Sequence, residues 1–151
     1  MLMNTKIYSL VIGFLVVIIA LGYWYKNQPI EAQRLVVDDC QIAEQTCHIS
    51  LDQQRSISID VLPKGMPLTQ ALWIDVKTKN WQADAVRVVF EGIEIDHHLP
   101  AYHLVKQNDN QFSGKGFLSL CSLSKMHWNA HFILDAGGEK YEVILPFVTQ
   151  R

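Results

Sequence analysis

The fold class is decided by the segment WNAHFIL, residues 128–134, whose side chains alternate with a period of two. One face carries Trp128, Ala130, Phe132 and Leu134, and the other carries Asn129, His131 and Ile133. Successive side chains of a β-strand point to opposite faces of the sheet. This spacing therefore predicts a strand with one face in a hydrophobic core. We expect Trp73 and Phe90 to lie at least partly in the same core.

Similar short segments precede and follow this strand, separated by turn residues. We expect strands at 47–51, 56–61, 72–76, 85–90, within 102–106, at 112–120 and at 141–148. The first two form a hairpin around residues 52–55, and Gly114 and Gly116 indicate a bulge or a close backbone approach. Short strands with a turn about every ten residues predict a mainly β fold, an immunoglobulin-like antiparallel β-sandwich.

A run without charged residues, IYSLVIGFLVVIIALGYWY at 7–25, precedes these strands. As a helix rising about 1.5 Å per residue it is roughly 28 Å long, close to the ~30 Å hydrocarbon thickness of a bilayer. The aromatic residues Tyr23, Trp24 and Tyr25 at its end are typical of a membrane interface. We therefore expect one uncleaved transmembrane helix. The alternative is a secretory signal cleaved after the segment Ala20-Leu21-Gly22.

The chain is thus expected to have four parts. They are a cytoplasmic N-terminus at 1–6, a transmembrane helix at 7–25, a linker at 26–34 and one exported β-sandwich domain at 35–151. The short N-terminus and the cysteines of the C-terminal part favour an N-inside, C-outside orientation. The formal charge of −2 and the pI near 6.3 show no basic excess, which disfavours nucleic acid as a partner.

Three cysteines lie in the expected exported domain. A disulfide is the default expectation in an oxidising compartment, and we expect Cys40 and Cys47 to be bonded because they are so close in sequence. The stabilisation for so short a loop is on the order of 2 kcal/mol. Cys121 is then left over. The alternatives are that Cys121 pairs with Cys47 or Cys40, or is a buried small hydrophobic residue.

A thiol, a thioether and an imidazole lie close together before the WNAHFIL strand, at Cys121, Met126 and His127. These ligand types select copper(I) over calcium, magnesium or manganese. His97 and His98 are further candidate ligands, and at most one joins a given site because neighbours on a strand point to opposite faces. His127 and His131 would stand about 13 Å apart on one strand and cannot share an ion. The alternative is that these side chains pack in the core or lie in solvent.

Enzymatic chemistry has little support in the sequence. No nucleophile elbow, phosphate-binding glycine loop or dinucleotide fingerprint occurs. The nearest approach to a carboxylate cluster is formed by Glu91, Glu94 and Asp96, which we expect at a solvated edge. We therefore expect a protein that is not an enzyme.

Three segments resemble those of single-pass bacterial membrane proteins that carry an exported β-sandwich. They are DDCQIAEQTC at 38–47, VVFEGIEIDHH at 88–98 and GKGFLSLCSLSKMHWNA at 114–130. The layout is also similar to that of FixH-like and YtkA-like proteins, which are associated with haem–copper oxidase assembly and copper handling. In those relatives the segment after the Val88–Gly92 strand is methionine-rich, whereas this chain offers His97 and His98 there.

The resemblance implies a protein of the bacterial inner membrane with its C-terminal domain in the periplasm. Two classes of function follow. One is a membrane-anchored accessory protein in copper handling or oxidase assembly, with copper as cofactor and a terminal oxidase or copper chaperone as partner. The other is a non-catalytic interaction or structural module of a membrane complex without a metal. Such a module would dock through a sandwich face or by strand addition at an exposed edge.

Overall fold

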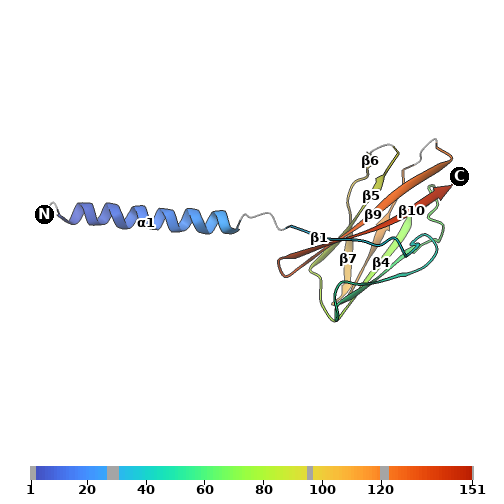
Figure 1. Ribbon diagram of the computed structural model, residues 1–151, viewed down its shortest axis with the longest axis horizontal. Helices are drawn as coiled ribbons and strands as arrows, with labels where there is room; N and C mark the ends of the chain where they lie inside the picture. Colours follow the sequence, from blue (N-terminus) through green and yellow to red (C-terminus); the bar gives the residue numbers. More distant parts are fainter. Residues whose placement is uncertain (1–2, 27–30, 95–96, 120–122, 151) are drawn as a thin grey trace. The chain divides into compact units, whose positions relative to one another are not determined.

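The computed structural model describes residues 3–26, 31–94, 97–119 and 123–150, with side chains except at residues 3–7 and 97. The chain divides into two compact units, Met1–Glu31 and Ala32–Arg151. The first is helical and the second is built of β-strands (Figure 1).

The helical unit is a single helix, α1, which spans Met3–Lys26. Its segment Tyr8–Lys26 is long and apolar enough to cross a membrane. Large apolar side chains on all sides of this segment are exposed, including Phe14, Ile18 and Ile19. A continuous helix over residues 7–25 agrees with the expectation from the sequence.

The β-rich unit contains ten described strands, and nine of them form one hydrogen-bonded path. Their bounds are β1 (Gln33–Val36), β2 (Cys47–Ser50), β3 (Ser56–Leu62), β4 (Leu72–Lys79), β5 (Ala85–Gly92), β6 (His97–His98), β7 (Tyr102–Asn108), β8 (Gln111–Gly116), β9 (Lys125–Ala136) and β10 (Glu139–Gln150).

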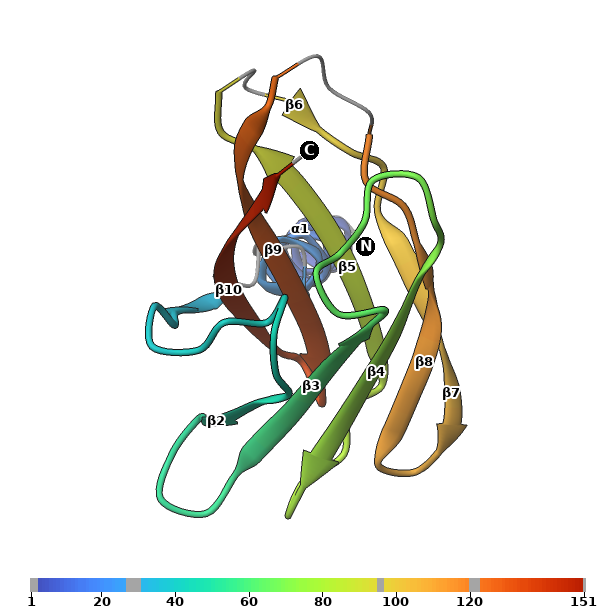
Figure 2. The same cartoon turned by 90° about the vertical axis from the view of Figure 1, so that its right-hand side faces the viewer.

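The sheet curls on itself to make two layers. The strand order is β1-β10-β9-β5-β7-β8-β4-β3-β2, and β6 pairs with β5 outside this order. Figure 2 shows β10, β9 and β5 on one side of the domain and β3, β4 and β8 on the other. All described pairs are antiparallel except β1 with β10, which is parallel. The prediction of a mainly β, sandwich-like domain preceded by one helix is confirmed.

Strand β9 shows why this sequence folds as a sandwich. Its residues Trp128, Ala130, Phe132 and Leu134 are at most 1% exposed, as the period-two pattern predicts. The ring of Trp128 stacks on Phe147 of β10 at a centroid distance of 6.3 Å. Its Nε1–H donates to the Thr149 hydroxyl over 3.0 Å, so the buried indole has no unpaired donor. Polar residues of β9 face outward instead.

Several local expectations are also confirmed. Strands β2 and β3 form the predicted hairpin. A Cβ atom at Gly114 would lie 2.9 Å from the Leu104 side chain, so β7 and β8 approach as closely there as the glycine suggested. Phe90 is fully buried.

Other expectations are wrong in detail. Trp73 is 56% exposed, because the alternation of β4 places it on the outer face of the sheet. Strand β8 ends at Gly116, earlier than the expected strand over 112–120. The strands β1 and β6 were not expected, and β1 begins at Gln33, inside the residues 26–34 expected to form a linker.

Candidate functional site

The structure does not bring the predicted copper ligands together among the residues it describes. Strand β9 begins at Lys125, so Met126 and His127 belong to a strand rather than to a loop. Neighbours on a strand point to opposite faces: Met126 is 1% exposed in the core, whereas His127 faces outward. Cys121 lies outside the described residues. A thioether packed in the core cannot ligate an ion together with His127.

His127 has a carboxylate partner instead. Its ring Nδ1 contacts the carboxylate of Glu94, and its backbone N–H donates to the same group over 2.9 Å. Both contacts favour the ionised carboxylate and hold the pKa of Glu94 below its usual value. Both side chains are substantially exposed to solvent. This pair therefore caps the beginning of β9 at the surface.

A connected polar group on the outer face of the domain surrounds His131, which was not among the predicted ligands. We call Arg34, Glu91, His98, His131 and Glu142 the His131 cluster; they come from β1, β5, β6, β9 and β10. His131 Nε2 lies 3.0 Å from Glu91 Oε2, and its Nδ1 lies 2.9 Å from Glu142 Oε1. Arg34 Nε donates to Glu142 Oε2 over 2.5 Å, and His98 Nε2 lies 3.4 Å from Glu91 Oε1.

Both carboxylates of this cluster are held in their ionised form. An ionised carboxylate accepts hydrogen bonds, and bonds of this kind favour the charged form. The hydrogen bond from His131 lowers the pKa of Glu91. Burial raises the pKa of Glu142, but the hydrogen bonds from His131 and Arg34 outweigh it, so that pKa is also lowered. The side chains of His131 and Glu142 are 16% and 11% exposed, so water competes less for their hydrogen bond than it would at an open surface.

Of the remaining predicted ligands, His98 belongs to this cluster, and only the backbone of His97 is described. The His98 side chain is more than half exposed. His97 pairs with Gly92 through its backbone, and its side chain is outside the description. Within residues 31–94, 98–119 and 123–150, no group of three or more His, Cys, Asp or Glu side chains has the arrangement of a metal site.

Sequence reasoning missed the His131 cluster for a topological reason. The alternation of residues 128–134 does place His131 on the polar face. Its partners Glu91 and Glu142 become neighbours only because β5 and β10 flank β9 on either side. No local sequence motif indicates that His131 contacts Glu91 and Glu142, so the strand order is needed to predict these contacts.

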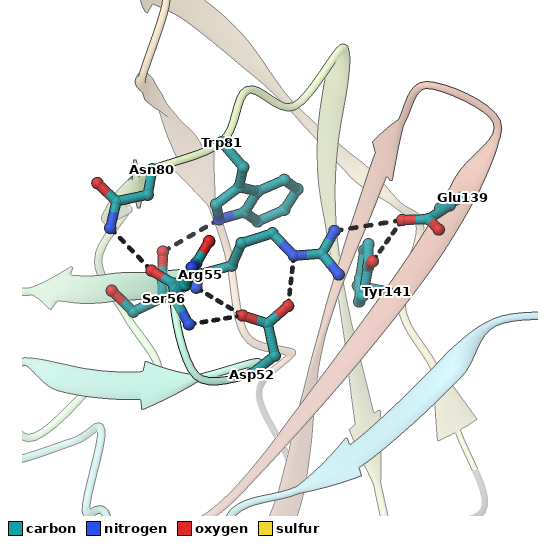
Figure 3. Close-up of polar contacts among 8 residues, drawn as sticks. Asp52, Arg55, Ser56, Asn80, Trp81, Glu139 and Tyr141 are labelled. Atoms are coloured by element: carbon teal, nitrogen blue, oxygen red, sulfur yellow. Dashed lines mark hydrogen bonds and ion pairs between the residues drawn. The ribbon is translucent and has the colours of Figure 1, made fainter.

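A second polar cluster lies at one end of the domain, where residues 52–56, 80–81 and 139–141 meet (Figure 3). Arg55 Nε donates to Asp52 over 2.6 Å, and its guanidinium reaches Glu139 over 3.3 Å. Trp81 Nε1–H donates to the Ser56 carbonyl over 3.1 Å. These contacts tie the turn before β3 to the β9–β10 hairpin of the other layer. The arrangement is that of a structural clamp.

The two end strands of the sheet order flank a groove of about 540 Å³. Leu35, Val37 and Ile49 are its less exposed lining residues, and Val36 is 57% exposed. The Val37 N–H donates to the Ile144 carbonyl of β10 over 3.0 Å. Backbone directions alternate along a strand, so the Val36 N–H points away from β10, toward the groove. We call this feature the edge groove.

Comparison of the chain with known protein families, curated proteins and solved structures gives no match.

Proposed function

We propose that this protein is a membrane-anchored, non-catalytic interaction module that binds an extended segment of a partner in a membrane complex. The binding mode is strand addition in the edge groove. The observation that carries the proposal is the presence of two end strands, β1 and β2, on either side of that groove. Among the described strands, neither has a partner on its outer side.

Edge strands present rows of free backbone N–H and C=O groups, which makes them templates for an added strand. A guest strand between β1 and β2 would hydrogen-bond on both sides. Its alternate side chains would contact Leu35, Val37 and Ile49 on the inside, as strand-addition complexes do. Asp38 and Asp39 are exposed along the same groove, so a guest with a basic residue at that end is favoured.

Two further observations support the setting in a membrane and an exported compartment. Segment Tyr8–Lys26 of α1 is suited to anchor the domain in a bilayer. Cys40 and Cys47 form a disulfide with a Cα–Cα distance of 5.8 Å, and disulfides persist in oxidising compartments such as the periplasm. The proposed location is therefore the bacterial inner membrane with the β-rich domain in the periplasm.

A pair of variants at one position tests strand addition. Val36→Pro removes the N–H that faces the groove, whereas Val36→Thr keeps it and changes the exposed side chain by a similar amount. The full chain would be purified from membranes in a mild detergent, and the co-purifying proteins quantified by mass spectrometry. We expect Val36→Pro to lower recovery of the partner about tenfold and Val36→Thr to leave it nearly unchanged.

Thermal melting of both variants is the folding control. The Val36 amide makes no hydrogen bond to β10, so both should melt close to the parent protein. If the partner is recovered equally with both variants, strand addition at β1 is ruled out.

Copper handling is a second candidate function, and one observation favours it. The Glu91 carboxylate lies between two imidazoles, 3.4 Å from His98 Nε2 and 3.0 Å from His131 Nε2. Imidazole and carboxylate ligands suit copper(II), provided that His131 exchanges its contact with Glu91 for the ion. Copper(II) titration of the full chain in detergent tests this. His98→Ala and His131→Ala should each weaken binding about tenfold or more. His103→Ala, on the exposed part of β7, should not; equal effects of all three would contradict the candidate.

A further inference from the structure

A trough of about 430 Å³ crosses the outer face of β3, β4 and β8, the three strands that lie side by side in Figure 2. Its volume falls within the roughly 300–1,000 Å³ range of small-molecule sites. Aromatic and aliphatic side chains line one end of the trough, and polar side chains line its floor. Its lining includes Leu62, Trp73, Asp60, Asp75, Lys77 and Ser113.

Trp73 forms the aromatic end. In register it lies between Leu62 of β3 and Lys115 of β8. The Lys115 ammonium is 4.3 Å from the centroid of the indole ring. Despite this contact, Trp73 remains 56% exposed. A large ring held on a rigid strand and open to solvent is a ready surface for stacking a ligand.

Two aspartates form the floor. Asp60 and Asp75 stand directly opposite each other on β3 and β4, an arrangement that is destabilising for like charges. Lys64 donates to Asp60 over 2.6 Å and lowers the pKa of that carboxyl. Gln111 donates to Asp75 over 2.6 Å. Each carboxylate has about four acceptor positions, so both retain acceptor capacity toward the trough.

The charges around the trough are nearly balanced. Besides the two aspartates there are three lysines: Lys64 is bonded to Asp60, Lys77 lines the trough, and Lys115 lies over the ring of Trp73. This surface has no strong preference for an anion or a cation. It offers ammonium and hydroxyl donors beside carboxylate acceptors, next to one aromatic ring. The matching ligand is neutral, carries many hydroxyl groups and has one apolar face.

We propose that this trough binds a saccharide, with the C–H face of one sugar ring stacked on Trp73 and its hydroxyls hydrogen-bonded to Asp60, Asp75 and Lys77. Each sugar hydroxyl is both a donor and an acceptor, so it can pair with carboxylates and ammonium groups alike. A protein partner fits less well, because the apolar lining is confined to one end of the trough. This activity is separate from strand addition in the edge groove, which lies between β1 and β2.

Calorimetric titration of the full chain with cellotetraose, maltotetraose and chitotetraose tests the proposal. The protein must be held in a detergent without a sugar headgroup, such as an amine oxide, since an alkyl maltoside would compete. We expect at least one of these oligosaccharides to bind. Trp73→Ala should weaken that binding about tenfold or more, and Trp73→Phe should retain most of it because the ring remains.

Asp75→Asn should weaken binding several-fold without lowering the melting temperature, because the substitution also removes the like-charge pair with Asp60. Val36→Thr, away from the trough, is the control and should bind as the parent does. The proposal is overturned if none of the three sugars binds at millimolar concentration. It is also overturned if Trp73→Ala binds as tightly as the parent, or if Trp73→Ala loses a co-purifying protein while no sugar binds.

Discussion

The guanidinium of Arg55 lies 5.3 Å from the ring centroid of Tyr141, so a residue of one layer of the sandwich covers an aromatic ring of the other (Figure 3). Tyr141 is 3% exposed, and its hydroxyl donates to Glu139 over 2.5 Å. Trp81 packs edge-on against the same ring at 5.5 Å. The hydrophobic core therefore ends here under a polar clamp that joins both layers.

Replacing Asp52 by Asn should change how stability depends on pH. Backbone N–H groups of Arg55 and Gln54 and the Arg55 side chain lower the pKa of Asp52 from 3.8 to about 2. A lowered folded-state pKa contributes stability that is present above the unfolded value and lost as pH falls through the folded one. The parent should thus melt higher than Asp52→Asn at neutral pH, and this difference should vanish as the pH falls from 3.8 to about 2.

The matched control is Asp109→Asn, because the Asp109 side chain is 79% exposed and its ion pair with Lys106 is long. This variant should follow the parent curve. A constant melting difference between parent and Asp52→Asn across the acid range would contradict the role given to Asp52.

Truncation of two tryptophans on the two layers should have very different effects on stability. Trp128 is 1% exposed, so Trp128→Ala should cost roughly 3–5 kcal/mol through cavity formation. A domain of this size has only about 5–15 kcal/mol of stability, so this variant should fold poorly. Trp73→Ala removes an exposed ring and should change stability by no more than about 0.5 kcal/mol. Urea unfolding of both variants measures the difference, and equal losses would refute the assigned register.

The contrast between these two tryptophans also shows which features of the structure can be predicted from the sequence. The period of two places Trp128 and His131 on opposite faces of β9, and it identifies most strands. The residues of Leu72–Lys79 alternate as well, but the opposite layer determines which of the two faces of this strand is buried. For this reason the sequence alone did not show that Trp73 is exposed. The His131 cluster, the Arg55 clamp and β1 depend on strand order, which local patterns do not encode. Cys40 and Cys47 were predictable because sequence proximity alone favours their bond.

The apolar helix should be retained in the mature protein. Tyr8–Lys26 has the length and composition of a membrane span, and Tyr23, Trp24 and Tyr25 at its end suit a membrane interface rather than a cleavage site. Intact-mass measurement of the protein from native membranes checks this. A mature chain that begins at Tyr23 would show that the segment is a cleaved signal.

Removing the disulfide should destabilise the domain modestly. Cys40 and Cys47 close a loop with a sequence separation of 7, for which loop-closure entropy gives about 2 kcal/mol. The variant Cys40→Ser with Cys47→Ser should show this loss in denaturant unfolding under oxidising conditions. Parent protein in a strong reductant should match the variant. Parent and variant that unfold alike without reductant would mean that the bond does not form.

Glu142→Gln should weaken the His131 cluster and make its stability depend less on pH. The substitution keeps the size of the side chain but removes the charge that faces both His131 and Arg34. A largely buried hydrogen bond to a charged partner is worth about 1–3 kcal/mol, so the free energy of unfolding at neutral pH should fall by that amount. Arg34 is 73% exposed and contributes the smaller share.

The sign of the pH effect follows from the lowered pKa of Glu142. The stability given by its ionised form is complete above its usual value of 4.5 and is lost as pH falls below it. The difference between parent and Glu142→Gln should therefore shrink in acid. Glu44→Gln, an exposed carboxylate between β1 and β2, is the matched control and should unfold like the parent at every pH. If Glu142→Gln also unfolds like the parent at neutral pH, then the contacts around His131 contribute no net stability, and the cluster is not the organised polar centre of this face.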